Sequence, residues 1–585
     1  MRYMLSILKR DSIGKWSAYI FISVLFIFIL NLTWLKWGNL YTDTFHDSWV
    51  VEEMLHGRVL YRDIFYEYGL FAPYFLAGLC SIFGYCLNVF IFCGIALTVA
   101  CIFFIYRICR LFVERSAAVL AAAIFIVAFV PGQYPYQSAF DFILPYSFAS
   151  IFLVLFSLAG LFCFLKFTFT KKSVYLNLWV LSVALVFLSR PVMGTMIYLG
   201  FIFPFAVYIA KGFFPGRSKA IGVMFLPVFI AAAAYLLFLF FANAWGGFDE
   251  GVVRQLAARS GNGDGGYVVR TMGLDHMWFN LIAAVSLFCV TCICVVLLAL
   301  AIRLFAERKY FIFGLLAFAA ALAGGLFFLT NMSQYCYLPL MSGFLALWFA
   351  GRIIVGGDIG RYGSLCALFS LGFFMALRVI LSANPAGAGF CFLAGVLTGG
   401  YIFFFRIAGD FFSMRIKQFS LRLFNIFLII FFIFIGSYYP ITSWAVLSKR
   451  TLPIACPRGT LIADNDKMAQ VFNDVVVYLR EHTDKNATVT AVPEISGINF
   501  FSQRRNPLRY YAFTRSAIVF FNEENVISDF KAKRPDYVVV LSKLSRRDGL
   551  FGVHYGVKLN TWIGDNYQLE NEWPGSLKIL KRKGS

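Results

Sequence analysis

The sequence predicts a polytopic α-helical membrane protein with a C-terminal soluble α/β domain. Of its 585 residues, 60% are hydrophobic and only 14% are charged, which is too apolar for a soluble fold. Apolar runs long enough to cross about 30 Å of hydrocarbon as helices recur over most of the chain. The composition then turns polar and mixed after Tyr439. These three observations predict a membrane module followed by a separate soluble domain.

The apolar runs define the membrane module. About thirteen of them have the length that a membrane-spanning helix needs. We expect these helices over residues 16-35, 86-108, 117-131, 143-166, 173-189, 193-210, 219-243, 278-303, 310-330, 336-351, 363-382, 388-405 and 422-440. The first run is long and lacks a small-residue cleavage pattern after it, so we expect it to be a retained anchor.

Basic residues at the ends of these runs predict the orientation, because Lys and Arg near span ends stay on the cytoplasmic side. With the N-terminus inside, the basic loops near residues 107-115, 166-172 and 406-422 all become cytoplasmic. The acidic loop 36-85 and everything after about residue 441 then face outward. We expect a multi-pass protein of a bacterial inner membrane. The net charge of +21 follows largely from this orientation, so no nucleic-acid partner is implied.

We divide the chain into a membrane module, residues 1-440, and an outward α/β domain, residues 441-585. Within the domain, helical spacing predicts helices over 464-482, 523-533 and 553-562, and short apolar runs predict buried strands over 487-492 and 537-541. This alternation predicts a small α/β layer. The basic cluster at 503-509 could contact an anionic acceptor or lipid headgroups, or it could be a solvated turn with structural ion pairs.

The cysteines indicate no further chemistry. Most of the 13 lie inside predicted spans, so no disulfide framework is implied.

The loop after the first span carries acidic residues beside the lipid. Ionisable groups there are costly unless they are used, which makes this loop the predicted active site. Asp43 and Asp47 would share one face of a helix that began at Asp43, and this helix would lie in the membrane interface with its apolar side on the lipid. We expect a second interfacial helix over 71-83. The alternative is that Asp47 caps the helix and Asp43 is solvated.

The same loop resembles the first periplasmic loop of the GT-C membrane glycosyltransferases, notably the lipid A aminoarabinose transferases and the protein O-mannosyltransferases. Asp43 matches the first acidic position of their signature, Gly57 the glycine and Glu67 the later glutamate. Thr44 stands where a second acid is usual, and Tyr68-Gly69 replaces a Lys-Pro pair. The turn 188-194 is similar to one at the outward end of the fifth span in these enzymes.

The resemblance implies an inverting glycosyltransferase. A polyprenyl-phosphate sugar would be the donor, and a lipid, polysaccharide or protein of the cell envelope the acceptor. Asp43 or Asp47 would act as the base that deprotonates the acceptor hydroxyl, and the sequence leaves open which of the two. Basic groups would stabilise the leaving phosphate. The candidates for the donor phosphate and substrate are His46, Arg58, Arg62, Asp63, Glu67, Asp141 and Arg190.

Several of these candidates have structural alternatives. Arg254, Arg259 and Arg378 are further candidates for the donor phosphate. Each candidate arginine could instead form a structural ion pair or reach toward the membrane interface. Arg190 is the strongest candidate because of its motif. Asp141 could be a helix cap. A divalent ion, Mg²⁺ or Mn²⁺, could bridge Asp43 and Asp47 to the phosphate through oxygen ligands.

Two other functions remain open from the sequence. A transporter or flippase of lipid-linked saccharide would predict internal repeats and ionisable residues at mid-bilayer, whereas the acids here cluster outside. A non-catalytic envelope assembly factor would bind partners through the C-terminal domain and leave the first loop structural.

Overall fold

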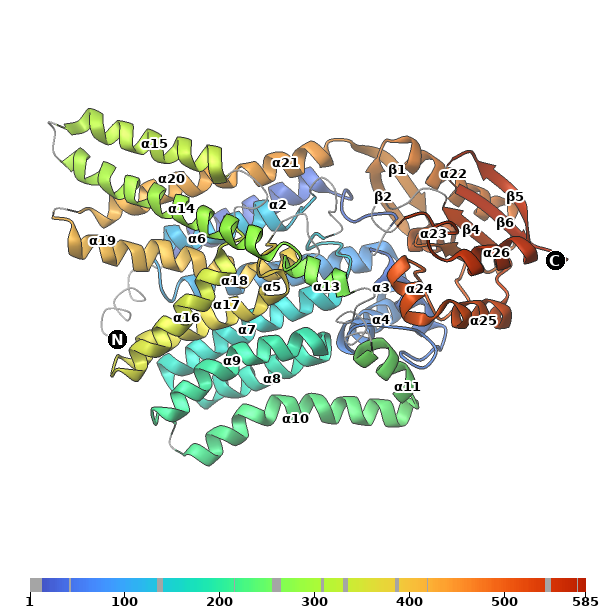
Figure 1. Cartoon of the computed structure of the whole chain (residues 1–585), viewed down its shortest axis with the longest axis horizontal. Helices are drawn as coiled ribbons and strands as arrows, with labels where there is room; N and C mark the ends of the chain where they lie inside the picture. Colours follow the sequence, from blue (N-terminus) through green and yellow to red (C-terminus); the bar gives the residue numbers. More distant parts are fainter. Residues whose placement is uncertain are drawn as a thin grey trace.

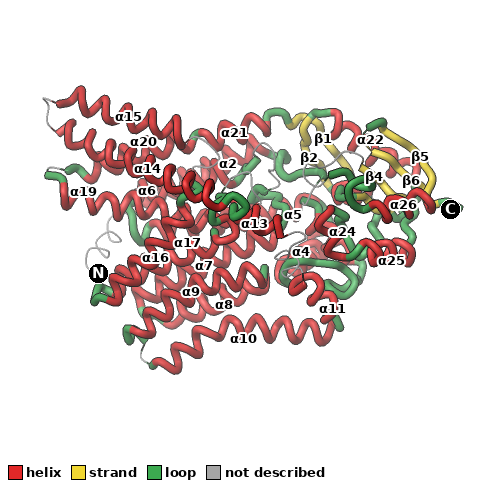
Figure 2. The backbone as a smooth tube through the Cα atoms, in the orientation of Figure 1, coloured by secondary structure: helices red, strands yellow, loops and turns green. Residues whose placement is uncertain are grey.

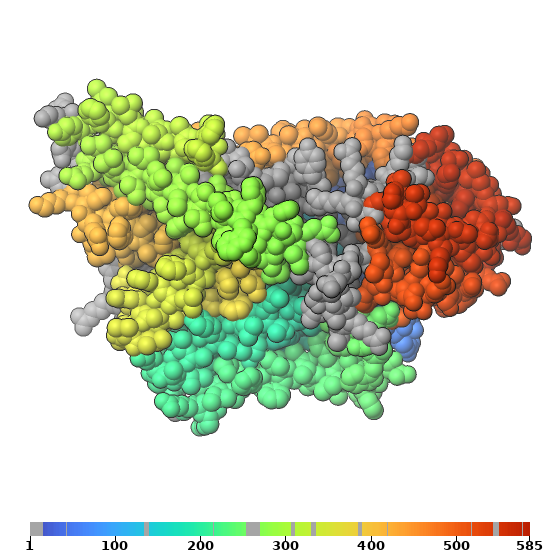
Figure 3. Space-filling model, viewed as in Figure 1, coloured from blue at the N-terminus to red at the C-terminus, as the bar shows by residue number. Residues whose placement is uncertain are grey.

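The structure is a computed structural model. It describes residues 13–41, 44–133, 140–214, 216–254, 265–306, 310–329, 335–383, 389–417, 419–541, 549–575 and 577–584. Long helices form one end of the molecule, and a domain that contains all the labelled strands forms the other (Figure 1). Figure 2 shows the same division by secondary structure, and the C-terminal domain forms the red end of the space-filling view in Figure 3. The chain is a polytopic α-helical membrane protein with a C-terminal sheet domain.

Each predicted apolar run corresponds to a helix or a series of helices. In order these are α2 (Ile13–Thr33), α5 (Leu87–Cys109), α6 (Arg115–Phe129), α7 (Phe148–Thr170), α8 (Ser173–Ser189), α9 (Pro191–Ala210), α10 (Arg217–Ala242), α14 (Met277–Ala306), α15 (Phe311–Leu329), α16 (Leu338–Ile354), α17 (Ile359–Met375), α18 (Leu393–Ile402), which continues through a π-helical turn (Phe403–Ala408) into α19 (Gly409–Arg415), and α20 (Leu421–Gly436) with α21 (Tyr438–Leu447).

Helix length separates two groups of these helices. Among the described residues, nine helical segments are long and apolar enough to cross a membrane, whereas α6, α8, α16 and α17 are apolar but have 10–17 residues. A helix of 16 residues spans only about 24 Å, so these four are short for the hydrocarbon layer. Helix α7 is central, since it contacts α5, α8 and α17 and most of its residues are buried.

The C-terminal domain is built on two sheets. Strands β1 (Arg450–Cys456) and β2 (Gly459–Asp464) pair antiparallel. The second sheet has the order β3-β4-β6-β5, in which β3 (Val489–Val492) and β4 (Tyr537–Leu541) are parallel, and β6 (Leu577–Arg582) pairs antiparallel with β4 and with β5 (Tyr567–Trp573). The helices of the domain are α22 (Lys467–His482), α23 (Ser496–Ser502), α24 (Arg515–Phe521), α25 (Glu523–Lys533) and α26 (Val557–Asn566).

The predicted strands and two of the three predicted helices of this domain lie where the sequence places them. The helix expected over 553-562 is instead α26, which begins at Val557. Gly556, just before it, has a φ of +64°, a left-handed conformation that glycine adopts without strain and that ends the preceding turn. Strands β1, β2, β5 and β6 were not predicted.

Short helices lie where the membrane helices meet the C-terminal domain. These are α3 (His46–Leu55), α4 (Phe71–Phe83), α11 (Trp245–Phe248) with a π-helical turn (Asp249–Arg254), and α13 (Gly265–Met272). Figure 1 shows α3, α4 and α11 at this end of the bundle. Helix α4 has exposed apolar side chains on one side, such as Ile82 and Phe83, and buried ones on the other, as an interfacial helix requires.

Helix α3 corrects two expectations. It begins at His46 rather than at Asp43, and Asp43 lies outside the described residues. Its residues from His46 to Glu53 are buried, and it contacts α4 and α23. It is therefore enclosed between the membrane helices and the C-terminal domain instead of lying on lipid.

Candidate active site

Asp47 connects the first loop to the central helix of the bundle. It lies in the first turn of α3 and is 3% exposed. One carboxylate oxygen accepts a hydrogen bond of 2.6 Å from the backbone N–H of Phe148, the first residue of α7. The other accepts a bond of 3.2 Å from the hydroxyl of Tyr66. Asp47 thus occupies the positive end of α7, and no side-chain cap of its own helix is formed.

Burial dominates the electrostatics of Asp47. Desolvation raises the pKa of its carboxyl to about 6, against the hydrogen bonds from Phe148 and Tyr66 and the nearby charge of Arg190, which lower it. Burial also lowers the pKa of His46 to about 4. At neutral pH, Asp47 is therefore mostly ionised and His46 is neutral.

Arg190 lies in the break between α8 and α9. Pro191 follows it as the first residue of α9, and a residue before proline is disfavoured in helical conformation, so α8 ends and Arg190 adopts an extended backbone. Its buried guanidinium donates hydrogen bonds to the hydroxyl of Tyr146, at 3.2 Å, and to that of Ser150. It also lies 4.1 Å from the ring centroid of Tyr68, a cation–π contact.

Glu67 completes a charged cluster with these residues. Its carboxylate is close enough to raise the pKa of Asp47 and of His46, and it also interacts with Arg190. Four predicted site residues, His46, Asp47, Glu67 and Arg190, are therefore brought together. They come from the first loop and from the α8–α9 break, and we call them the Asp47 cluster.

The C-terminal domain contributes a residue to this cluster. The ring of Tyr511 stacks on the imidazole of His46 with 3.6 Å between centroids, and it lies 5.9 Å from Trp49. Sequence reasoning did not assign Tyr511, Tyr146, Tyr66 or Tyr68 to the site. The only sequence signal was that Tyr66 and Tyr68 flank Glu67 in the recognised motif.

Other predicted residues have structural roles or lie elsewhere. Asp141 is fully buried and accepts hydrogen bonds from the backbone N–H groups of Gly38, Ile143 and Leu144 and from the Gln133 amide, at 2.5 to 3.1 Å. This carboxylate holds the loop before α7 in place, but it caps no helix, because α7 begins at Phe148 after the N-cap Ser147. Arg378 lies near Cys391, as does Arg190.

Two candidates lie outside the described residues, namely Asp43 and Arg259, and nothing is described of the Arg254 side chain. Of the two predicted bases, the structure describes Asp47, and Asp43 stays a prediction. In the described part of the chain, no group of three His, Cys, Asp or Glu side chains is placed to hold a metal ion. A divalent ion shared by Asp43 and Asp47 stays a prediction, because one of its two ligands is not described.

Arg58, Arg62 and Asp63 lie at the opposite end of α3 from Asp47. Arg58 donates to a carboxylate oxygen of Glu53 at 3.0 Å and to two backbone carbonyls, and Arg62 pairs with Asp63 at 2.9 Å. The Glu53 side chain is 0% exposed and also accepts from Arg505 of the C-terminal domain, at 2.7 Å. Its neighbour Glu52 pairs with Arg458 of the same domain at 2.6 Å. These ion pairs fasten the loop to the domain.

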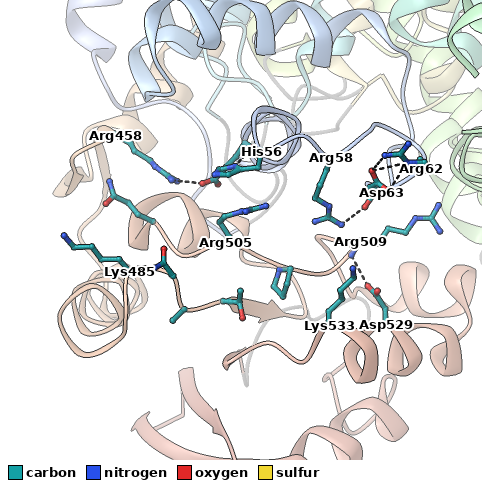
Figure 4. Close-up of a pocket in the computed structure, with 16 residues that line it drawn as sticks. His56, Arg58, Arg62, Asp63, Arg458, Lys485, Arg505, Arg509, Asp529 and Lys533 are labelled. Atoms are coloured by element: carbon teal, nitrogen blue, oxygen red, sulfur yellow. Dashed lines mark hydrogen bonds and ion pairs between the residues drawn. The ribbon is translucent and has the colours of Figure 1, made fainter. Parts of the chain in front are cut away.

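A cavity of about 760 Å³ opens beside these ion pairs (Figure 4). It is lined by α3 and the loop after it on one side and by the C-terminal domain on the other.

Comparisons with known proteins address the fold. No family model matches the chain, and no curated protein matches it by sequence. The oligosaccharyltransferase AglB of Archaeoglobus fulgidus, in complex with an inhibitory peptide and a dolichol-phosphate, is similar in structure with a TM-score of 0.53 and 14% identity, over 98% of this chain and 75% of AglB. AglB tethered to an acceptor peptide gives a TM-score of 0.50 and 14% identity, over 97% and 74%.

ArnT of Cupriavidus metallidurans, bound to undecaprenyl phosphate, has a TM-score of 0.43 and 12% identity, over 98% of this chain and 99% of ArnT. At these identities the likeness concerns the fold. The similarity to AglB extends over nearly the whole chain, membrane helices and C-terminal domain together. The chain therefore shares its overall fold with AglB.

Proposed function

We propose that this protein is a membrane glycosyltransferase. It transfers a sugar from a polyprenyl-phosphate donor to a hydroxyl group of a cell-envelope acceptor, with inversion at the anomeric carbon. The observation that carries the proposal is the Asp47 cluster, in which a buried carboxylate and a buried guanidinium lie close enough to interact electrostatically. The similarity to AglB, whose structure holds a dolichol-phosphate, supports a lipid-phosphate donor.

In this proposal Asp47 is the general base. A base must be ionised yet able to accept a proton near neutral pH, and burial places the pKa of Asp47 at about 6. The acceptor oxygen attacks the anomeric carbon while its proton passes to the Asp47 carboxylate. The bond from that carbon to the phosphate oxygen breaks, and the phosphate leaves with the electron pair.

Arg190 stabilises the leaving phosphate. A lipid phosphate needs positive charge and hydrogen bonds more than a proton as it departs. Arg190 can supply both, and its contacts with Tyr146, Ser150 and Tyr68 fix the guanidinium before the donor binds. His46, neutral at pH 7 because of its burial, can donate or accept a hydrogen bond without adding charge beside Asp47.

Substrate binding requires movement at the cluster. Asp47 is 3% exposed, so an acceptor hydroxyl can reach the carboxylate only when neighbouring side chains are displaced. Tyr511 covers His46 from the C-terminal domain. We infer that a shift of this domain or of the first loop opens the site.

Orientation belongs to the same proposal. Helix α3, which carries His46 and Asp47, lies at the end of the bundle next to the C-terminal domain (Figure 1). We propose that this end faces outward from a bacterial inner membrane and that the N-terminus is cytoplasmic, as the basic loops indicate.

The test is complementation of a deletion strain with Asp47→Asn, read by mass spectrometry of the envelope glycans. We expect transfer to fall by about a hundredfold or more with normal expression. Asp474→Asn, an exposed aspartate on α22, is the matched control and should restore the glycans fully. Full glycosylation with Asp47→Asn would refute the assignment.

The side on which the donor accumulates separates this proposal from a flippase. A transferase that lacks its base leaves the lipid-linked sugar on the outer face, where an added glycosidase can reach it. A defective flippase leaves it on the inner face, protected from the same enzyme.

A further inference from the structure

The cavity between α3 and the C-terminal domain is basic and polar. Seven basic and three acidic side chains are among its sixteen lining residues. Among the described residues of the lining, only Ala487 and Pro507 are apolar, and none is Phe, Tyr, Trp, Leu, Ile, Val or Met. Its volume of about 760 Å³ is in the usual range for a small-molecule site, roughly 300 to 1,000 Å³. Such a lining is unsuited to an acyl chain and suited to a polar anion.

The acidic residues of the lining are already engaged. Glu52 pairs with Arg458 and Asp63 with Arg62. Asp529 accepts a hydrogen bond of 2.9 Å from the backbone N–H of Arg509. The charges of Glu52 and Asp63 are thus paired, whereas Asp529 keeps its negative charge because its partner is an uncharged backbone N–H.

The cavity has more positive than negative charge at Arg58, Arg505, Lys485 and Lys533. Arg58 and Arg505 share one carboxylate, that of Glu53, so the three groups carry a net charge of +1. Within the described residues, Lys485 and Lys533 have no ion pair or side-chain hydrogen bond. They lie on different sides of the cavity, with Arg505 between them (Figure 4). The lining therefore keeps an excess of positive charge, which attracts phosphate or carboxylate groups.

We propose that this cavity binds a phosphate-bearing saccharide through Lys485, Lys533 and Arg505. Its position relates it to the Asp47 cluster without overlapping it. Glu52, which lines the cavity, follows Asp47 by five residues on α3, about 8 Å along the helix axis. A saccharide anchored here by its phosphate could extend one or two units toward Asp47. This acceptor role rests on the proposed function, whereas the anion site itself does not.

Binding is measured by titration calorimetry on the full chain in phosphatidylcholine nanodiscs, with glucose 1-phosphate as probe and glucose as the uncharged comparison. We expect saturable binding of glucose 1-phosphate alone, weakened by added salt because the charges are partly exposed. The double variant Lys485→Gln/Lys533→Gln should raise the Kd about tenfold or more.

The matched control is Lys467→Gln/Lys531→Gln, which removes the same charge from exposed positions outside the cavity and should leave the Kd unchanged. The proposal would be overturned if both double variants lost affinity for glucose 1-phosphate equally. It would also be overturned if the unmodified chain bound no glucose 1-phosphate, whether or not the nanodiscs contain phosphatidylglycerol.

The phosphate could also belong to a lipid headgroup. Nanodiscs that contain phosphatidylglycerol distinguish the two sources. If the headgroup occupies the cavity, these nanodiscs weaken the binding of glucose 1-phosphate, and native mass spectrometry finds phosphatidylglycerol on the unmodified chain but not on Lys485→Gln/Lys533→Gln. If the source is a soluble saccharide, the Kd is the same in both nanodiscs.

Asp47→Asn separates this site from the proposed activity. The variant should bind glucose 1-phosphate with an unchanged Kd even though it no longer transfers sugar. Binding by the unmodified chain together with full transfer by Asp47→Asn would refute the proposed function and leave the anion site intact. If sugar transfer depends on Asp47 but the cavity shows no specific binding, the anion site is refuted and the proposed function is kept.

Discussion

The ring of Tyr511 stacks on the imidazole of His46 with 3.6 Å between centroids and 17° between planes. The two residues belong to different parts of the chain, His46 to the first loop and Tyr511 to the C-terminal domain. His46 is followed directly by Asp47, so this contact brings the domain against the candidate base.

We expect Tyr511→Ala to lower sugar transfer by about tenfold, equivalent to ~1.4 kcal/mol of transition-state stabilisation, because His46 loses the ring that fixes its orientation. Tyr511→Phe keeps the ring and should retain most of the activity. The C-terminal domain offers a matched pair in Tyr478, which stacks on His482 at 4.4 Å. Tyr478→Ala should leave the transfer rate unchanged, and an equal loss in both alanine variants would contradict a specific role for Tyr511.

The rate of transfer should depend on pH through Asp47. Burial raises the pKa of this carboxyl to about 6, and only the ionised form can accept the acceptor's proton. Measured from pH 4.5 to 8.5, kcat/KM should therefore fall below about pH 6, whereas an ordinary aspartate would keep it level down to about pH 4. A rate that stays constant down to pH 5 would show that Asp47 is not the base.

Folding stability should change with pH in the opposite direction. The pKa of Asp47 is higher in the folded state than in the unfolded one, so the folded state binds more protons. The stabilising contribution of the protonated carboxyl is complete below the unfolded pKa and is lost as the pH rises through about 6. Asp47→Asn removes this dependence. The unfolding midpoint of the unmodified chain should therefore fall relative to that of Asp47→Asn between pH 4 and pH 7.

The membrane helices could be predicted because lipid imposes a strict rule on sequence. A span must satisfy its backbone internally and present about 20 apolar residues, and α5, α7 and α10 obey this rule plainly. Strands β5 and β6 escaped prediction because they carry charges, as in Glu570, Glu572 and Lys578, and most of their residues are exposed or half-buried. Such a strand has a polar composition that resembles a loop.

The candidate site was only partly visible in the sequence. Arg190 and Glu67 came from motifs, and the structure places them together with Asp47. Asp141 has the same chemistry as Asp47, and its role in holding the loop before α7 became visible only when four donors were found around its carboxylate. Tyr511 carries no local signal, because its contact with His46 arises from the docking of two distant segments.

Arg190 should act on the donor phosphate through the planar fork of its guanidinium. Arg190→Lys keeps the charge but loses the paired donors, and we expect kcat/KM to fall by about tenfold. Arg190→Gln should lower it by about 10² to 10³. The control is Arg110→Gln, at the end of α5 far from the C-terminal domain. The other end of α5 begins at Leu87, whose N–H contacts that domain, and Arg110 lies about 34 Å from it along the helix. Equal rates for Arg190→Gln and Arg190→Lys would mean that charge at this position does not stabilise the leaving group.

Glu53 should govern how firmly the C-terminal domain is held. Its carboxylate is 0% exposed and bridges Arg58 of the loop to Arg505 of the domain, at 3.0 and 2.7 Å. Glu53→Gln removes the negative charge from both contacts, each of which is a hydrogen bond between ions. We expect the free energy of unfolding to fall by about 2 kcal/mol. The loss is no larger because the two arginines are partly exposed and can regain water. Thermal unfolding of the purified chain should begin several degrees lower, and limited proteolysis should release the domain faster.

Glu481→Gln, an exposed substitution on α22, should alter neither measurement. If Glu53→Gln unfolds and is cleaved like the unmodified chain, the domain is held by its apolar contacts with the loop, such as those of Phe45 with Phe500 and Phe501, and not by this ion bridge.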